Sequence, residues 1–298
     1  MKTVIIPTRN RPKLLDHTVK VILEQLNSTD EIIIVDSSDS PNESELVNGS
    51  SRIRYIRTEI KSAAAQRNIG IEQISTCDHV FFLDDDVVPP QDYFFKCSRL
   101  LDETGAVGVS GLAINPNAKK FREVPSGISG LLHKFFLLDS KKDGVLLKSG
   151  INIPLRKLDD GFSQTDWLIG CSAWRFNSIG DTRFENDFKG QSLAEDVIFS
   201  NRMGRKGILI TDSRIILAHD ESPIERPANF EFWEMWILNR LRLIKVAKFG
   251  WAGFLSYWWA NLGQALIFTL LILKSESEHI ESFKGLKSGV NKVVRKKS

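Results

Sequence analysis

His79-Val80-Phe81-Phe82-Leu83-Asp84-Asp85-Asp86 joins a mostly apolar run to three consecutive acids. The first five residues predict a buried β-strand, which leaves the acids at its carboxyl end. In open α/β sheets, ligands bind at this edge of the strands. Three neighbouring carboxylates repel one another unless a cation or hydrogen-bond donors accompany them. The stretch therefore predicts a cation or phosphate site at a sheet edge, with a solvated acidic turn as the plainer alternative.

Further apolar runs alternate with helical patterns on both sides of this strand. Strands are predicted at residues 3–6, 31–35, 53–56, 79–83 and 106–110, and helices at 12–26, 62–74 and 91–101. Strands with nearly continuous apolar residues are typical of a mostly parallel sheet that helices cover on both faces. The predicted fold class is therefore α/β, with polar residues gathered where the strands end.

The rest of the chain divides into three regions. Residues 112–165 are rich in Gly, Pro, Asn and Lys and predict an irregular insert, such as a lid. Regular patterns then return, with a helix beginning near Ala194 and short strands at 208–210 and 215–218. We expect one catalytic-type domain over residues 1–225 and a helical, aromatic and basic extension over 226–298.

The extension carries the signals for a membrane. Residues 251–273 contain no charged side chain and are flanked by Lys248 and Lys274. This length could cross a bilayer, but Asn261, Gln264 and the clustered aromatic residues also suit an interfacial helix. A helical hairpin packed on its own domain or on a second subunit is the alternative. The last residues, 284–297, hold six basic residues and no acid, as expected of a solvated tail or one that binds anionic lipid.

The composition is that of an ordinary folded protein, because 42% of the 298 residues are hydrophobic and 26% are charged. The net charge of +3 says little about partners. The three cysteines lack metal-like spacing and fit a reducing cytosol. Met1 leads straight into a predicted strand, so no secretory signal of the usual kind is expected. We expect no nucleic-acid partner, and the oligomeric state stays open.

Six segments, in order, resemble the family 2 glycosyltransferases, which are inverting enzymes of the GT-A fold. They are VIIPTRNR at 4–11, EIIIVD at 31–36, AQRNIG at 65–70, FLDDD at 82–86, GCSAWRF at 170–176 and AEDV at 194–197. The resemblance implies a metal-dependent transfer of a sugar from a UDP- or dTDP-sugar to a hydroxyl of a glycan or lipid-linked acceptor. Surface polysaccharide synthesis at the inner face of the plasma membrane would be the setting, with the protein peripheral and cytoplasmic.

The resemblance also implies a donor site. Its expected residues are Pro7, Thr8, Arg9, Asn10, Asp36, Arg67, Asn68, Asp84 and Asp85. Asp36 could accept a hydrogen bond from the N–H of uracil or thymine, although on its own a turn residue would be the better reading. Arg67 could pair with phosphate or with a nearby carboxylate, although on its own a surface arginine would be expected.

The metal ligand carried over from the family is Asp86, with His219 as a second, and Mn²⁺ or Mg²⁺ as the ion. Asp196 is the expected catalytic base, with Glu195 beside it, and which acid is the base stays open. On their own, both acids would simply complement a helix N-terminus. The expected acceptor or sugar contacts are Asp166, Trp167, Gly170 and Trp174, with core packing as the alternative for both tryptophans.

Two other classes of protein remain as alternatives. Residues 7–12 contain no glycine, unlike the phosphate loops of sugar nucleotidyltransferases and dinucleotide dehydrogenases. A non-catalytic membrane-associated scaffold could keep the fold, but we would expect it to have lost the acids at 84–86 or 195–196, which this chain retains.

Overall fold

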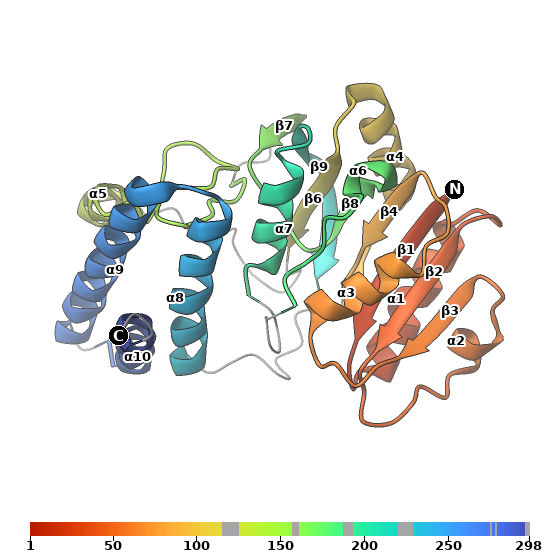
Figure 1. The fold of residues 1–298 in the computed structure, drawn as a ribbon, viewed down its shortest axis with the longest axis horizontal. Helices are drawn as coiled ribbons and strands as arrows, with labels where there is room; N and C mark the ends of the chain where they lie inside the picture. Colours follow the sequence, from red (N-terminus) through yellow and green to blue (C-terminus); the bar gives the residue numbers. More distant parts are fainter. Residues whose placement is uncertain are drawn as a thin grey trace. The chain divides into compact units, whose positions relative to one another are not determined.

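The computed structural model describes residues 1–114, 125–156, 161–186, 193–219, 229–274, 276–277 and 279–295. The chain separates into two compact units (Figure 1). The first comprises residues 1–121 and 155–222, and the second comprises 122–154 and 223–298. Part of the predicted insert thus belongs with the C-terminal helices. The predicted division near residue 225 stays a prediction.

The first unit is built on one nine-stranded sheet. Its strands are β1 (Lys2–Thr8), β2 (Glu31–Asp36), β3 (Ile53–Arg57), β4 (His79–Phe82), β5 (Val87–Val88), β6 (Gly108–Ile114), β7 (Phe162–Thr165), β8 (Ser172–Arg175) and β9 (Leu209–His219). Their order is β3-β2-β1-β4-β8-β6-β9-β5, and β7 pairs with β9. The first four in this order are parallel, and β8 enters antiparallel between β4 and β6.

The parallel strands bring the expected site residues to one edge. The register pairs Thr8 at the end of β1 with Asp36 at the end of β2, and β4 ends beside β1. The chain runs from β1 outward to β2 and β3 and then returns to the other side of β1 as β4. Ligands of open α/β sheets bind at the carboxyl ends of the strands beside such a reversal of strand order, which here falls between β1 and β4.

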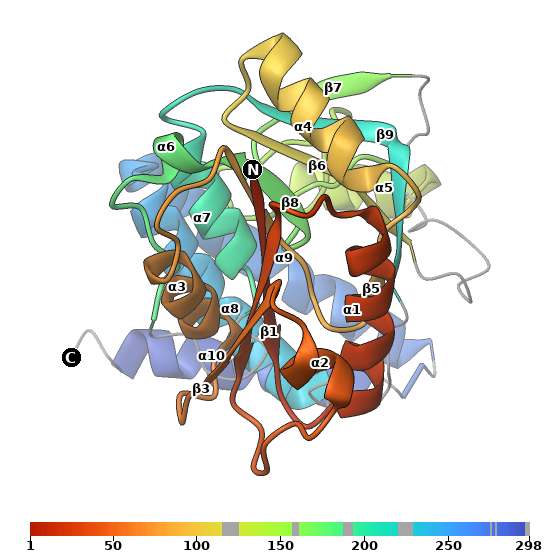
Figure 2. The ribbon, with the colours of Figure 1, turned by 90° about the vertical axis from the view of Figure 1, so that its right-hand side faces the viewer.

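Helices cover both faces of the sheet, as the apolar strands predicted (Figure 2). One face packs on α1 (Pro12–Gln25), α2 (Glu45–Gly49) and α4 (Tyr93–Thr104). The other packs on α3 (Ala63–Glu72), α6 (Phe176–Ile179) and α7 (Glu195–Met203). Alternate residues of each strand supply the two cores, because side chains alternate between faces: Ile32 and Ile34 join one core, and Ile33 and Val35 join the other.

The second unit is helical. It contains α5 (Gly127–Phe135), α8 (Asn229–Val246), α9 (Gly250–Leu273) and α10 (His279–Arg295). The α10 helix lies close against α8, because Gly285 and Gly289 face the backbone of Phe230 and the side chain of Ile237. The basic segment is therefore largely a helix with one packed face, and Lys292 pairs with Glu234 of α8 at 2.8 Å.

Two sequence predictions need correction. The region 112–165 is not irregular throughout, because it contains α5, whose glycine-rich start obscured the apolar spacing of Ile128, Leu131 and Leu132. The two short strands at 208–210 and 215–218 are one strand, β9. The polar residues Thr211 to Arg214 suggested a break there. Instead, Asp212 binds the guanidinium of Arg214 at 2.6 Å, and β9 continues.

Candidate active site

The three acids after β4 do not share one environment. The strand ends at Phe82, so the alternation of side chains along a strand, which would put Asp84 and Asp86 on the same side, does not extend to the acids. Asp85 is 5% exposed and accepts a hydrogen bond from the hydroxyl of Thr8 at 2.6 Å, which joins the ends of β1 and β4. Asp84 points elsewhere, toward Arg67. Contrary to the alternating pattern, Asp85 and Asp86 face a common partner, the guanidinium of Arg11 at 3.2 and 3.0 Å.

This pair of acids is where the expected cation would bind. Burial raises the pKa of Asp85 to about 6, although the bonds from Thr8 and the charge of Arg11 oppose the rise. Among the described residues, no cluster of three His, Cys, Asp or Glu side chains surrounds one point. The guanidinium of Arg11 is the cation that these carboxylates contact, and carboxylate oxygens are also ligands that suit Mg²⁺ or Mn²⁺. The donor chemistry therefore fits a divalent ion.

Strand pairing brings the backbone of His219 close to Asp86. It is the last residue of β9 and pairs with Val87 of β5, the residue that follows Asp86. The backbone of His219 is therefore beside the acidic turn. Its side chain lies outside the described part of the structure.

Arg67 joins the strand tips to a helix far along the chain. Its side chain is 3% exposed, donates to Asp84 at 2.6 Å and pairs with Glu195, the first residue of α7. Burial alone would lower the pKa of Arg67, but the carboxylates of Glu195 and Asp84 outweigh it and raise the pKa above its usual value. Arg67 is thus a buried link between two acidic segments, in line with the expected pairing to a nearby carboxylate and unlike the alternative of a surface arginine.

Three consecutive residues of α3 reach three different segments. Gln66 donates to the carbonyls of Thr8 and Val35, at 2.9 and 2.5 Å, and so fixes the ends of β1 and β2. Asn68 donates to the carbonyl of Phe184 at 2.9 Å and accepts from its N–H at 2.8 Å. Successive helical residues point about 100° apart, so one helix can hold the ends of β1 and β2 together with the α7 side. The described contacts of Asn68 therefore position the chain, and its expected role in donor binding stays untested.

Asp196 differs from its neighbour Glu195. Glu195 is buried and held by Arg67, whereas Asp196 is half-buried and accepts the N–H of Val197 at 2.8 Å. Burial raises the pKa of Asp196 to about 6, with Arg67 opposing the rise. The preceding Ala194 has a φ of +72°, a left-handed conformation that costs a residue with a side chain about 1 kcal/mol. Such local strain is often retained at functional sites.

A pocket of about 250 Å³ opens beside the ends of β1 and β2. Its lining residues are Thr8, Asn10, Pro12, Leu15, Asp36, Ser38, Asp39, Ser40, Pro41 and Asn42. Asn10 crosslinks the two loops, since its amide donates to the side chain of Asp39 and accepts from the N–H of Asp39, both at 3.0 Å. Three of the residues expected to hold the nucleoside, Thr8, Asn10 and Asp36, therefore line one pocket, while Pro7 is buried and Arg9 is half-buried.

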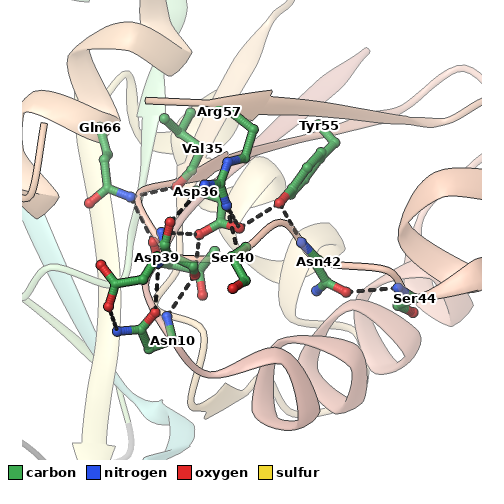
Figure 3. A network of polar contacts seen from close by, with 12 residues as sticks. Asn10, Val35, Asp36, Asp39, Ser40, Asn42, Ser44, Tyr55, Arg57 and Gln66 are labelled. Carbon is green, nitrogen blue, oxygen red and sulfur yellow. Dashed lines mark hydrogen bonds and ion pairs between the residues drawn. The ribbon is translucent and has the colours of Figure 1, made fainter. Parts of the chain in front are cut away.

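Asp36 is more fully engaged than the sequence suggested. One oxygen accepts from the N–H of Ser38 at 2.7 Å and from the hydroxyl of Ser38. The other accepts from Tyr55 at 2.5 Å and from Arg57 at 3.4 Å (Figure 3). A carboxylate offers about four acceptor positions, so a nucleobase would reach Asp36 only by displacing one of these donors.

The expected acceptor residues divide between the site and the core. A Cβ added to Gly170 would lie 3.4 Å from Arg67 and 3.9 Å from Asp84, so this glycine borders the central ion pair. Asp166 is exposed and Trp167 is 9% exposed. Trp174 is 1% exposed and meets Phe199 edge to face, which is the core-packing alternative and leaves no ring face for a sugar.

Sequence reasoning missed several site residues. Arg11 lies inside the PTRNR segment at 7–11, but a charged residue just before Pro12 is also typical of the start of a helix, so it did not stand out as a site residue. Tyr55 and Arg57 alternate with Arg54 and Ile56 along β3, which identifies a strand face but not the acid that they contact. Cys171 lies 3.6 Å from the carboxylate of Asp84 and was set aside because it lacked metal-like spacing.

Comparison with known proteins identifies the family. Residues 3–160, just over half of the chain, match the family described as Glycosyl transferase family 2. The chain belongs to glycosyl transferase family 2. This family 2 chain is also 29% identical over 131 residues to an uncharacterized glycosyltransferase of Rickettsia conorii, which covers 42% of this chain and 22% of that protein. A homologue from Rickettsia felis matches 130 residues at 29% identity, covering 42% and 21%. The chain thus spans about a fifth of the length of these curated relatives.

Solved structures confirm the predicted fold. A mannosyltransferase from Pyrobaculum calidifontis, in complex with GDP-Man and Mn²⁺, has a TM-score of 0.59 at 15% identity, covering 100% of this chain and 88% of that one. GalNAc-T7 with UDP, GalNAc and Mn²⁺ gives 0.62 at 15% identity, covering 99% and 57%. S. aureus TarS 1-349 with UDP-GlcNAc gives 0.52 at 12% identity, covering 98% and 91%. The family 2 chain therefore has a GT-A-like sheet with flanking helices, together with the C-terminal helices α8–α10.

Proposed function

We propose that this family 2 chain is an inverting glycosyltransferase that uses a nucleotide-diphospho-sugar, with UDP or dTDP as the nucleotide. The observation that carries the proposal is the link through Arg67. It draws the acid at the tip of β4 and the first acid of α7 to one buried guanidinium, next to the glycine at 170. An acidic strand tip, a buried guanidinium and an acidic helix start are thereby assembled at one place.

In the proposed reaction, an acceptor hydroxyl oxygen bonds to the anomeric carbon from the side opposite the nucleotide. The bond from that carbon to the diphosphate oxygen breaks, and the nucleoside diphosphate leaves with the electron pair. The hydroxyl proton passes to a carboxylate. Asp196 is the better base of the two acids, because Glu195 is held by Arg67 while Asp196 is half-buried and ionised above pH about 6. Glu195 then positions Arg67.

The donor would be held in two places. The nucleoside would occupy the pocket at Thr8, Asn10 and Asp36, and the diphosphate would extend along the strand ends toward Asp84. A divalent cation held by Asp86, with His219 as second ligand, would offset the charge of the departing diphosphate. The structural neighbours were solved with UDP or with GDP-Man. GDP therefore belongs in the test.

The acceptor proposed is a hydroxyl of a glycan or of a lipid-linked glycan, in surface polysaccharide synthesis. Among the described residues, one helix, α9, has the length and composition to cross a membrane, which is weak evidence for a span. We place the protein in the cytoplasm, peripheral to the inner face of the plasma membrane. The uncharged length of α9 and the basic residues of α10 support this placement.

Calorimetric titration with UDP, dTDP and GDP, each with and without Mn²⁺, tests the donor site. The proposal expects Mn²⁺-dependent binding of UDP or dTDP that Asp86→Ala abolishes. The matched control is Asp92→Ala, which removes an exposed acid shortly after Asp86 in the chain and should bind the nucleotides as wild-type does. Wild-type protein that binds none of the three nucleotides would contradict the proposal, and preference for GDP would overturn the choice of nucleotide.

A further inference from the structure

The α9 helix carries a continuous row of exposed apolar side chains. The row consists of Trp251, Leu255, Trp259, Leu262, Leu266, Leu270 and Leu273. Their spacing of three and four residues places them on one side of the helix, over its whole length of roughly 36 Å. Trp251 is 82% exposed and Leu273 is 76% exposed. A surface helix of a soluble protein ordinarily presents charged residues on such a side, and α9 has none.

The neighbouring α5 helix extends this surface. Ile128, Leu131 and Phe135 are exposed by 79%, 69% and 63%, and their spacing places them on one side of α5. The indole N–H of Trp259 donates to the carbonyl of Phe135 at 2.8 Å, and their rings lie 5.2 Å apart. The two exposed rows therefore meet, as the adjacent helices show in Figure 1. We call them together the α5–α9 face.

The opposite side of α9 is already occupied. Gly263 packs against the ring of Phe136, and Tyr257 donates a hydrogen bond to the carbonyl of Ile237 on α8 at 3.0 Å. Asn261 accepts a bond from the buried Arg240 of α8 at 2.5 Å. A helix that crossed a bilayer would have to leave these partners. With them in place, α9 can meet lipid only along its exposed side, parallel to the membrane surface.

The positive charge of the second unit indicates which partner the α5–α9 face binds. The described residues of the second unit include thirteen lysines and arginines but only six aspartates and glutamates. Lys248 precedes α9 and Lys274 follows it, and both are exposed. Two copies of this unit would bring like charges together, which disfavours a symmetric dimer through the face. A bilayer containing anionic lipid matches both the apolar row and the cations at its ends.

We propose that the α5–α9 face is a docking surface for an anionic membrane, with α9 lying in the plane of the interface. The inference names the surface for the membrane association proposed above and rests on that part of the proposed function. Trp251, Trp259 and the leucines enter the boundary between headgroups and acyl chains, while Lys248 and Lys274 remain at the headgroups.

Flotation of the full chain with lipid vesicles tests the proposal. Wild-type protein should bind vesicles of phosphatidylcholine with 30% phosphatidylglycerol, a composition that supplies anionic surface charge, more tightly than phosphatidylcholine alone, and less tightly at high salt. The variant Leu255→Gln/Leu262→Gln/Leu266→Gln should bind at least about tenfold more weakly, because it removes buried apolar area. The matched control is Ile60→Gln/Phe95→Gln/Ile216→Gln, which changes three exposed apolar residues of the first unit and should bind normally.

Quenching of tryptophan fluorescence by brominated lipids measures depth. An in-plane helix predicts quenching by bromines near the headgroups, and Trp251→Phe should reduce it. Quenching strongest at the bilayer centre would overturn the in-plane orientation. Failure of the wild-type protein to bind anionic vesicles would overturn the proposal. A dimer in solution that the leucine variant converts to a monomer would also overturn it.

The donor titration separates this inference from the enzymatic proposal. The leucine variant should still bind UDP or dTDP with Mn²⁺ as wild-type does, because the changed residues lie in the second unit. Vesicle binding without nucleotide binding would contradict the glycosyltransferase activity alone. Nucleotide binding without vesicle binding would contradict the docking face alone.

Discussion

Arg67 is the residue on which the candidate site depends most. It is buried and neutralises two acids from different segments, Asp84 and Glu195. Replacing it with Met would leave both carboxylates in a site built around a cation. Breaking a buried ion pair by removing one partner costs about 3–5 kcal/mol.

Arg67→Met should therefore lower the free energy of unfolding by about 3–5 kcal/mol and abolish sugar transfer. Arg67→Lys should recover part of the stability but not the paired contacts, since an ammonium cannot replace the planar fork. Arg54→Met, which removes an arginine that is 46% exposed and pairs with Glu31, should change stability by less than about 1 kcal/mol. Urea unfolding measures all three, and equal losses for Arg67→Met and Arg54→Met would refute the buried link.

Asp196 should set the acidic side of the pH profile. A base with a pKa of about 6 is ionised above that pH, so kcat/KM should fall about tenfold per pH unit below 6. Asp196→Asn should remove nearly all turnover while leaving donor binding intact. Glu195→Gln should retain the same midpoint of the pH profile. If the midpoint disappeared in Glu195→Gln, Glu195 would be the base instead of Asp196.

The same raised pKa predicts that removing the charge of Asp196 stabilises the fold. Below pH 3.8 the carboxyl group of Asp196 is neutral in both states, and between 3.8 and about 6 only the unfolded chain ionises it. The fold therefore loses stability over that range, and the loss is complete above pH 6. Asp196→Asn should accordingly raise the free energy of unfolding at pH 8 by about 1–3 kcal/mol. Thermal unfolding measures it, and a destabilised variant would contradict the burial of this charge.

Arg11 should compete with a divalent cation. It pairs with Asp85 and Asp86 at 3.2 and 3.0 Å. Arg11→Met should lower the Tm of the metal-free protein and enlarge the rise in Tm that Mn²⁺ produces. Lys13→Met removes an exposed cation two residues further along the chain and should leave both the Tm and the effect of Mn²⁺ unchanged. A smaller Mn²⁺ effect in Arg11→Met than in wild-type would show that Arg11 supports the metal site.

At the scale of elements, α8 and α9 meet around a buried charge without an acidic partner in the described structure. Arg240 is fully buried, and its Nε and Nη1 groups have no hydrogen-bond partner. Its contacts are the carbonyl of Tyr257, the amide of Asn261 and the ring of Tyr257. Burial lowers the pKa of Arg240 to about 10.

Arg240→Met should therefore leave the Tm unchanged or raise it, because it fills the same space without the cost of burying a charge. Arg240→Ala should lower the Tm through the cavity that it leaves. Lys245→Met, an exposed change on the same helix, serves as the reference. A large loss of stability in Arg240→Met would show that the charge is compensated by a bound anion or water.

The elements that sequence could predict are those whose pattern is local. The continuous apolar run from Ile32 to Val35 and the helical spacing of Leu15, Val19 and Ile22 each lie within one segment, and both predictions were confirmed. The partners of Asp36 and Arg67 depend on which strand tips and helix starts fold together, and no local pattern encodes that. Motif resemblance placed Thr8, Asn10, Asp84 and Glu195 in one site, but it could not reveal Arg11 as the cation held there or Trp174 as core.

At the scale of the whole molecule, the second unit is assembled from two separate stretches of chain. The α5 region packs Phe136, Leu138 and Ile151 against Ala260 and Ile267 of α9. A chain ending at residue 222 would retain α5 but lose every partner from α8 to α10.

Such a shortened chain should aggregate, because it exposes the apolar surface that α9 covers. Replacing residues 125–154 of the shortened chain by a short Gly-Ser linker should restore a soluble first unit. Light scattering of both proteins measures the difference. Equal solubility would mean that α5 does not depend on the C-terminal helices.

The reach of α3 also bears on attempts to engineer the protein. Gln66, Arg67 and Asn68 touch the ends of β1 and β2, the tip of β4 with α7, and the segment at 184–186. Recombination among relatives that exchanged only residues 166–203, the segment with the proposed acceptor contacts, would separate these side chains from the partners to which they are fitted. Chimeras should fold and function only when residues 63–72 are exchanged together with residues 166–203, so that two blocks distant in sequence must come from the same parent.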